Sequence, residues 1–286
     1  MNPTMTAEPV SSAPAPVETP EVTRTSASPV AGRLVVNADD WGRDLETTTK
    51  TLDCLRCETV SAVSGMVFME DSERAAALSQ EHAVDTGLHI NLSSRFSAAN
   101  CPQPLAEHHH KVARFLLSHA LARVLFHPGL VRSFEYVVKA QIEEFQRLYG
   151  KPPDRFDGHH HLHLCANVLV GGLLPRGTLI RRNFSFHPGE KSRLNRFYRK
   201  AVDQRLSRHH RVVDFVFALA PLEPASRLER IFSLARQSVV EVETHPVNLD
   251  EYRYLAQREI LRRWANLRIA RGFTGGKNSN PTQHPS

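Results

Sequence analysis

The segment RLVVNADDWG, from Arg33 to Gly42, decides the fold class of this chain. It begins as an apolar, β-branched run that is typical of a buried strand, and two aspartates follow where the strand breaks into a loop. Six similar runs follow it at 60–68, 85–92, 155–163, 178–186, 212–219 and 238–245. Segments with helical spacing separate these runs, and such alternation is typical of a parallel sheet. We therefore predict an α/β fold of about seven parallel strands with outer helices, closed as a barrel or open and doubly wound.

The helical segments define the domain organisation. They are expected at about 44–56, 69–81, 164–174, 191–207, 223–237 and 249–267. Two more, 111–126 and 128–150, form one long insertion after the third strand. We predict one barrel domain over residues 32–273, between a disordered extension (1–31) rich in Pro, Ala, Ser and Thr and a flexible tail (274–286).

The composition excludes several function classes. The formal charge is +6, but the basic residues are scattered rather than gathered with aromatic residues, so no nucleic-acid partner is expected. No apolar run reaches the ~18 residues of a membrane span. The first residues lack the basic start and apolar core of a signal peptide, and the four cysteines fit a reducing compartment. We therefore predict a cytoplasmic protein.

Polar residues gather at the ends of the predicted strands. Asp39 and Asp40 end the first strand, His89 lies near the end of the third, and His245 ends the last. The fourth strand runs into the histidines of 159–163. In parallel α/β folds, functional groups collect at the carboxyl ends of strands, so these side chains are candidates for one site.

The first and third of these strands each have a structural alternative. Two-residue alternation places Asn37 and Asp39 on one face of the first strand, with Asp40 at the loop. An Asp before Gly is also common in turns and helix caps. An inward His89 can offer a neutral nitrogen to a metal, but a histidine in an apolar strand is often a core residue with its hydrogen bonds satisfied.

The histidine run is the most specific local signal. If the strand continues through FDGHHHLHL, then Asp157, His159, His161 and His163 share one face and His160 takes the other. Burying so many imidazoles requires compensation, for which a metal or a charged ligand is suited. A second run, His108–His110, lies in a loop-like part of the insertion and is expected to be solvated, with a role at the rim.

The last strand supplies the fourth motif, EVETHP. Glu241, Glu243 and His245 alternate onto one face, and Pro246 ends the strand. His245 can act as a general acid near neutral pH, although a histidine before a proline turn can also be a cap. Together the motifs offer a metal site with open positions for water, a base and an acid, which are the requirements of metal-assisted amide hydrolysis.

These motifs resemble those of the YdjC/ChbG family of carbohydrate deacetylases. NADDWG, GLHINL, DGHHHLH and EVETHP occur here in the family's order. The resemblance implies a distorted TIM-like (β/α) barrel and one divalent cation, Mg²⁺ or Zn²⁺, held by Asp40, His89 and His159. It also implies Asp39 as base and His245 as acid. The residues alone leave the two aspartate roles exchangeable and His161 as an alternative ligand.

Departures from the family pattern suggest substrate contacts. Trp41 replaces a Phe and is expected to form a larger stacking wall beside the metal, and Thr244 replaces a Cys. Glu243 adds an inward carboxylate suited to a cationic or amino sugar. Arg181, with its neighbour Arg182, is expected either to bind a phosphate or carboxylate of the substrate or to form a paired surface charge. The substrate candidates are Trp41, His161, Arg181 and Glu243.

The predicted function is a metal-dependent N-deacetylase that converts an N-acetylated mono- or oligosaccharide, including lipid- or nucleotide-linked forms, to acetate and a free amine. One alternative is another metal hydrolase such as a phosphoesterase, which needs a second metal. The other is a non-catalytic sugar-binding protein, which has no need of Asp39 or His245. A homodimer is one assembly compatible with the chain.

Overall fold

The computed structural model describes Met1 and residues 32–186, 190, 192–264 and 268–273. The predicted extension and tail lie, apart from Met1, outside these residues. Within the described part of the chain, no helix combines the length and the apolar composition that crossing a bilayer requires.

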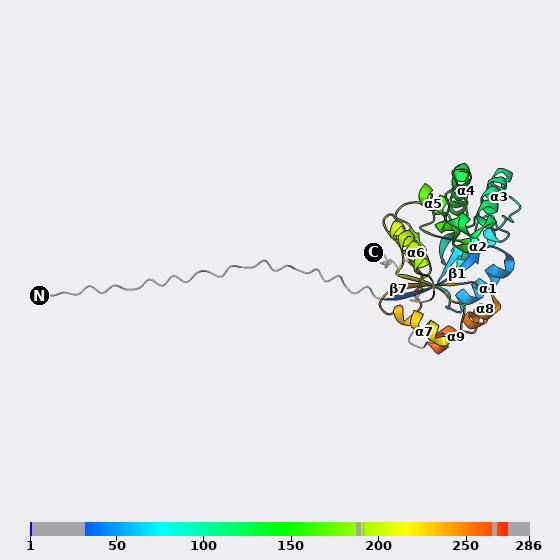
Figure 1. Cartoon of the computed structure of the whole chain (residues 1–286). Coiled ribbons are helices and arrows are strands. Elements are labelled where there is room, and N and C mark those ends of the chain that lie inside the picture. The colour runs from blue at the N-terminus through cyan, green and yellow to red at the C-terminus, as the bar shows by residue number, and fades with distance from the viewer. Residues whose placement is uncertain (2–31, 187–189, 191, 265–267, 274–286) are drawn as a thin grey trace. The chain divides into compact units, whose positions relative to one another are not determined.

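The described strands form one parallel sheet in the order β5-β4-β3-β2-β1-β7-β6 (Figure 1). Their bounds are β1 Arg33–Trp41, β2 Ala62–Gly65, β3 Asp85–Ile90, β4 Arg155–Gly158, β5 Leu179–Ile180, β6 Phe215–Ala218 and β7 Val239–Thr244. Neighbouring strands in this order are consecutive in sequence, except that β1 pairs with β7. The two edge strands, β5 and β6, are also consecutive in sequence.

Backbone hydrogen bonds draw those two ends together. The Ile180 amide donates to the Arg211 carbonyl (2.9 Å), and the Arg211 amide donates to Thr178 (3.0 Å). Further along, the Ser185 amide donates to the Val216 carbonyl (2.8 Å). The sheet is therefore curled into a distorted barrel, which confirms the predicted α/β barrel over the open, doubly wound alternative.

Helices cover the outside of the sheet, and their bounds agree with most of the sequence prediction. They are α1 Leu45–Arg56, α2 Ser72–Glu81, α5 Ala166–Gly171, α6 Arg193–Ser207, α7 Ala225–Leu234, α8 Leu249–Ala256 and α9 Glu259–Arg263. The single helix expected over 249–267 is two helices, since Arg258 takes a left-handed conformation (φ 58°) between α8 and α9. Residues 265–267 lie outside the described residues.

The insertion between β3 and β4 is helical. It contains α3 Gln103–Ser118, the 3₁₀ turns η1 Ala120–Arg123 and η2 Pro128–Leu130, and α4 Val131–Tyr149. The run His108–His110 lies within α3, and His109 is buried. The expected loop is therefore a helix, and the expected solvation is wrong for His109, whose ring packs against Phe96 (centroids 4.3 Å apart), whereas His110 is exposed.

Alternation along the strands sorts apolar from polar side chains. In β1, Leu34, Val36 and Ala38 pack outward in a core with residues of α1, α7 and α8, while Asn37 and Asp39 belong to the buried polar set. The same division holds in β7, where Val240 and Val242 join that core. The barrel thus carries an apolar layer under its helices and a polar interior, as the period of two predicts.

The histidine run departs from the predicted strand. β4 ends at Gly158, and residues His159–Leu164 form a 3₁₀ segment, η3. His160 and His161 both have φ 56°, in the left-handed region, so the chain turns sharply. The expected alternation of His159, His161 and His163 on one strand face is therefore wrong, because these two residues redirect the side chains that follow.

Candidate active site

The carboxyl ends of β1 and β3 and the start of η3 bring Asp40, His89 and His159 together. The Asp40 Oδ1 atom lies 2.9 Å from His159 Nδ1 and 3.3 Å from His89 Nε2. One ligand atom from each residue lies within 4.8 Å of the others, and all three residues are buried. This group consists of the three residues for which the sequence suggested a metal.

The backbone at Asp40 explains how two adjacent aspartates serve the same interior. Asp40 has φ 63°, and the pairing of β1 with β2 shifts register between Ala38 and Trp41. The irregularity lets Asp39 and Asp40 both point inward, which an unbroken strand would not allow. It also sends Trp41 to the outer core, where its Nε1 donates to Ala75 (3.1 Å) and Ser79 (3.0 Å). The predicted role of Trp41 as a wall beside the metal is therefore wrong.

His89 is oriented by a carboxylate on the neighbouring strand. Its Nδ1 lies 2.8 Å from Asp157 Oδ1, and its buried Nε2 has no hydrogen-bond partner. A carboxylate on one ring nitrogen leaves the other free to bind a metal, as second-shell groups do in metal sites. The unsatisfied Nε2, aimed at Asp40, is the feature of this structure that fits a bound cation.

The charges around His89 favour a cation at the same place. Burial alone would lower the pKa of His89, but the Asp39 charge, the hydrogen bond with Asp157 and the nearby Asp40 carboxylate raise it to about 10. Burial would raise the pKa of Asp40, yet the hydrogen bond from His159 and the nearby His89 ring hold it well below its usual range. The Asp40 carboxylate is thus ionised and can act as a ligand. It lies at the mouth of the barrel, where the carboxyl ends of the strands meet.

Arg181 organises a second cluster of carboxylates in the barrel interior. Its guanidinium bonds both oxygens of Asp39 (2.6 and 2.7 Å) and also contacts Glu241 (2.6 Å), Glu243 (3.0 Å) and Asp157 (3.1 Å). Burial would lower the pKa of Arg181, but the Asp157 and Asp39 charges raise it well above the usual value. The alternative of a paired surface charge is wrong for Arg181, since its side chain is enclosed by the chain's own carboxylates. Arg182 does form such a pair, with Asp203 at 2.8 Å.

The two glutamates of β7 differ in their surroundings. Burial raises the pKa of Glu241 to about 7 in spite of Arg181. Glu243 is also buried, but Arg181 and a hydrogen bond with His161 (Nε2 to Oε2, 3.1 Å) lower its pKa to about 2. The sequence predicted that Glu243 faces inward, and its partners there are Arg181 and His161.

His245 follows β7 and borders the same interior. One of its ring nitrogens lies within 4.8 Å of ligand oxygens of Asp39 and Glu243. Its backbone amide donates to Glu251 (3.0 Å), and Thr244 Oγ1 donates to the same carboxylate (2.6 Å). The hydroxyl of Thr244 therefore anchors the end of β7 to α8, in the position where the family motif has a Cys.

One contributor to the site, Asp157, was not selected from the sequence. Asp157 orients His89, and it accepts hydrogen bonds from Ser64 and Arg155 (3.3 Å). The sequence indicated Asp157 only through its place in the histidine motif. Its partner depends on the register of β3 and β4, which pairs His89 with Asp157. His163 is instead structural: its Nε2 bonds the Arg181 carbonyl (2.9 Å), and burial lowers its pKa to about 3.

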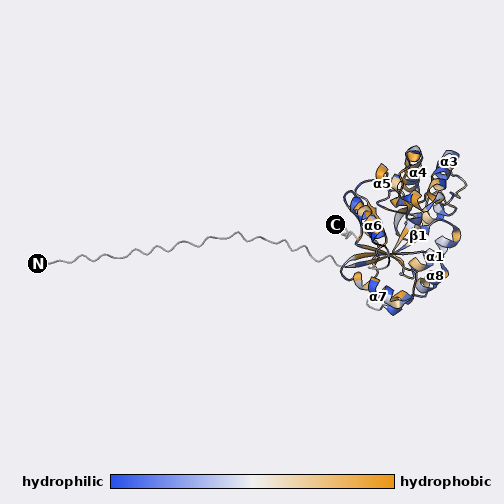
Figure 2. Cartoon of the chain, viewed as in Figure 1, coloured by the Kyte–Doolittle hydropathy of each residue, from blue (hydrophilic) through white to orange (hydrophobic). Residues whose placement is uncertain are grey.

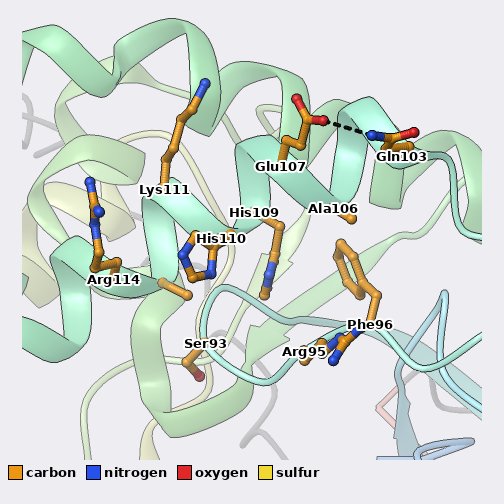
Figure 3. Close-up of a pocket in the computed structure, with 11 residues that line it drawn as sticks. Ser93, Arg95, Phe96, Gln103, Ala106, Glu107, His109, His110, Lys111 and Arg114 are labelled. Atoms are coloured by element: carbon orange, nitrogen blue, oxygen red, sulfur yellow. Dashed lines mark hydrogen bonds between the residues drawn. The ribbon is translucent and has the colours of Figure 1, made fainter.

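Two pockets border this region. One, of about 850 Å³, lies between the loop after β3 and α3 and is lined by Phe96, His110 and Arg114 among others (Figure 3). Ser93 connects it to the site, because its Oγ is 3.1 Å from His160 Nδ1. The other, of about 360 Å³, is lined by His160 and His161 and extends to η1 and α6.

Comparison with known proteins places the chain in a family. It is 30% identical over 144 residues to a carbohydrate deacetylase of Mus musculus, covering 48% of this chain and 44% of the relative. It is 29% identical over 136 residues to a chitooligosaccharide deacetylase of Yersinia pestis (strain Pestoides F), covering 47% of this chain and 52% of the relative. The matches thus span about half the length of these curated relatives.

A solved structure shares the fold. A crystal structure from Enterococcus faecalis V583, described as a cellobiose-phosphate cleavage protein, superposes with a TM-score of 0.60 at 15% identity, covering 84% of this chain and 97% of that one. The profile of the YdjC-like proteins matches residues 33–264, which include the barrel and every site residue described above. The chain therefore belongs to the YdjC-like protein family.

Proposed function

We propose that this chain is a metal-dependent N-deacetylase that hydrolyses the acetamide of an N-acetylated mono- or oligosaccharide to acetate and a free amine. The observation that carries the proposal is the buried, unpartnered His89 Nε2, aimed at an ionised Asp40 and close to His159. Without a metal, a protonated His89 must offset the Asp40 charge, and a metal can take the place of that proton, since Asp/His/His is a donor set of catalytic metal sites. The relatives named as carbohydrate and chitooligosaccharide deacetylases support the choice of reaction.

Asp40, His89 and His159 would hold the cation. When bound, a divalent cation supplies Lewis acidity toward an acetamide oxygen and makes water more acidic. Asp157 keeps the His89 ring in the orientation that presents Nε2. Two imidazoles with one carboxylate suit Zn²⁺ better than Mg²⁺, so we propose zinc as the preferred ion.

Asp39 and His245 divide the proton transfers in this proposal. Asp39 is fixed by the two bonds from Arg181 and by the Asn37 amide (2.8 Å), so the carboxylate has a set orientation for taking a proton from water. His245, half-buried on the other side of Asp39, gives a proton to the departing amine. Because Arg181 and Asn37 orient Asp39 whereas Asp40 faces the two histidines, we assign the base to Asp39 and the ligand role to Asp40.

The sugar would enter from the mouth formed by the β3 loop and η3. The 850 Å³ pocket along α3 has room for more than one sugar ring, and Ser93 of its lining bonds His160, next to the ligand His159. We therefore favour an oligosaccharide or a linked sugar over a free monosaccharide. The cytoplasmic location and a homodimer remain predictions.

A phosphoesterase with two metals is the second candidate. Asp39, Glu243 and His245 also bring one ligand atom each within 4.8 Å. However, Arg181 Nη1 already bonds both Asp39 (2.6 Å) and Glu243 (3.0 Å). The permanent charge of Arg181 therefore compensates these carboxylates without a second metal. One metal per chain is the expected result of elemental analysis, and two metals would favour the phosphoesterase.

The deciding experiment is acetate release by the metal-loaded protein from N-acetylglucosamine, its oligosaccharides, and nucleotide- and lipid-linked acetamido sugars. Asp39→Asn is expected to lower the rate by about 10²–10⁴-fold, the usual contribution of a general base. Asp250→Asn, an exposed aspartate at the start of α8, is the matched control and should leave the rate unchanged. Equal acetate release by wild type and Asp39→Asn would refute the assigned base. Phosphate release without acetate release would refute the reaction.

A further inference from the structure

Helix α6 presents an apolar stripe to solvent. Leu194, Phe197, Tyr198 and Ala201 follow the i, i+3, i+4, i+7 spacing of one helix face, and all four are exposed. Leu194 is 79% exposed and Phe197 is 72% exposed. A surface helix normally turns such a stripe toward the protein, but the buried residues of α6 are Val202 and Leu206. The apolar face of α6 is therefore available to a partner.

The same helix, which mixes hydrophilic and hydrophobic residues in Figure 2, carries an excess of positive charge. It contains one carboxylate, Asp203, which is paired with Arg182, and five basic residues: Arg193, Arg196, Arg199, Lys200 and Arg205. Among the residues that the structure describes, Arg193, Arg196 and Lys200 form no ion pair with a carboxylate. Exposed apolar side chains flanked by free cations are typical of helices that lie in the headgroup region of a bilayer.

A second exposed segment faces α6 across the smaller pocket. Ala120 and Arg123 of η1 line that pocket opposite Tyr198 and Arg199 of α6. The chain around η1 exposes further large apolar residues: Leu117, Leu121, Val124, Leu125 and Phe126. Because the pocket also reaches His160 and His161, both apolar segments border the approach to the candidate site.

We propose that α6 and the segment 117–126 together form a docking surface for an anionic lipid bilayer, with the smaller pocket opening toward the headgroups. Apolar side chains would enter the interface while the basic residues of α6 meet anionic lipids. This binding goes beyond the proposed deacetylation and does not depend on it. It would hold the site next to sugars presented at a membrane surface.

Charge complementarity favours a bilayer over a second copy of the chain. A two-fold dimer through α6 would bring its unpaired cations close to the same cations of the partner, and like charges in an interface are unfavourable. Nucleic acid is also disfavoured, because the most exposed side chains of the stripe are Leu194 and Phe197, which suit an apolar phase better than phosphates.

Two other exposed leucines provide a matched control. Leu45, at the start of α1, is 58% exposed and lies between Asp44 and Glu46. Leu249, at the start of α8, is 49% exposed and is followed by Asp250 and Glu251. These leucines are flanked by carboxylates, so they are not expected to bind an anionic surface.

The test is co-sedimentation of the full chain with vesicles of phosphatidylcholine alone or mixed equally with phosphatidylglycerol. Binding to the mixed vesicles that weakens with added salt is expected. Leu194→Ser with Phe197→Ser should weaken it by about tenfold or more through lost apolar insertion. Arg193→Gln with Lys200→Gln should also weaken it by at least tenfold. Leu45→Ser with Leu249→Ser should have no effect.

Other outcomes would overturn the proposal. The proposal fails if the wild type does not bind the mixed vesicles, or if the Leu45/Leu249 control loses as much vesicle binding as the Leu194/Phe197 variant. It also fails if light scattering shows a dimeric wild type and a monomeric Leu194/Phe197 variant, since this would identify a second copy of the chain as the partner. Circular dichroism and acetate release from a water-soluble substrate, both expected to be unchanged in that variant, separate lost docking from lost folding and from failure of the proposed reaction.

Discussion

The barrel contains two clusters of buried carboxylates, and they are balanced in different ways. Around Arg181, the carboxylates of Asp39, Glu241 and Glu243 meet a permanent cation that the chain supplies. At the mouth, one oxygen of Asp40 bonds Arg43 (2.7 Å), and the other faces His89 and His159, whose positive charge depends on a proton. The raised pKa of His89 shows that the surrounding carboxylates favour a cation there. The first cluster is thus complete within the chain, whereas the second can exchange protons for a metal.

The largest expected effect is the loss of the permanent cation. Arg181→Met should reduce the free energy of unfolding by at least about 3–5 kcal/mol, the usual range for breaking a buried ion pair, because several carboxylates lose their partner together. Urea unfolding measures this. The control Arg182→Met, which breaks a partly exposed pair with Asp203, should cost about 0–1 kcal/mol. Similar losses in the two variants would mean that Arg181 does not organise the interior.

The next effect separates metal binding from proton transfer at the mouth. His159→Ala should lose both bound metal and acetate release, because it removes a ligand. His245→Ala should keep the metal and lose about 10²–10⁴-fold in rate, the usual contribution of a general acid. Elemental analysis and acetate release on the same samples check this. Equal metal loss in both variants would contradict the division of roles.

A smaller effect is expected from the carboxylate that orients His89. Asp157→Asn should weaken metal affinity by about 10–100-fold, as loss of a second-shell partner typically does. Ser64→Ala removes a different hydrogen bond to Asp157 and leaves the contact with His89, so it serves as the control. Competition with a chelator gives both affinities. An unchanged affinity in Asp157→Asn would show that His89 is oriented by other contacts.

The smallest effect concerns the two glutamates beside Arg181. The pKa of Glu241 is raised from 4.5 to about 7 in the folded chain, so its charge increasingly opposes folding as pH rises from 4.5 to 7. Over that range the free energy of unfolding of Glu241→Gln should rise relative to that of the wild type by about 3 kcal/mol, at about 1.4 kcal/mol per pKa unit.

Glu243→Gln is the internal comparison for this pH effect. The pKa of Glu243 is lowered to about 2, so its contribution is present above pH 4.5 and is lost only as pH falls toward 2. Its stability difference from the wild type should therefore stay constant from pH 4.5 to 7. Urea unfolding at several pH values measures both differences. If the two variants show the same dependence on pH, Glu241 and Glu243 do not lie in different electrostatic environments.

The sequence predicted the features that depend on local periodicity. Alternation in β1 and β7 correctly placed Asn37, Asp39 and Glu243 in the interior, since a strand fixes side-chain direction within a few residues. The strand ends also indicated that Asp40, His89 and His159 would meet, because parallel strands end on one side of a barrel. The family resemblance added the roles within this group.

The features that were missed depend on backbone conformation or on distant partners. Trp41 was misplaced because the left-handed Asp40 reverses the direction that simple alternation assigns. The burial of Arg181 could not be predicted, since its partners come from β1, β4 and β7 and only the folded barrel brings them together. Nothing in the local sequence around Arg181 distinguishes it from Arg182, which is partly exposed.

The left-handed pair His160 and His161 has a consequence for how this chain can change in sequence. Non-glycine residues in that region cost of order 1 kcal/mol or more each, and two in succession make η3 a locally unfavourable turn. Replacing them with glycine would relieve the strain but remove the rings that contact Ser93 and Glu243. Selection for thermal stability alone would therefore erode the mouth of the site, so in this loop stability and activity are competing traits.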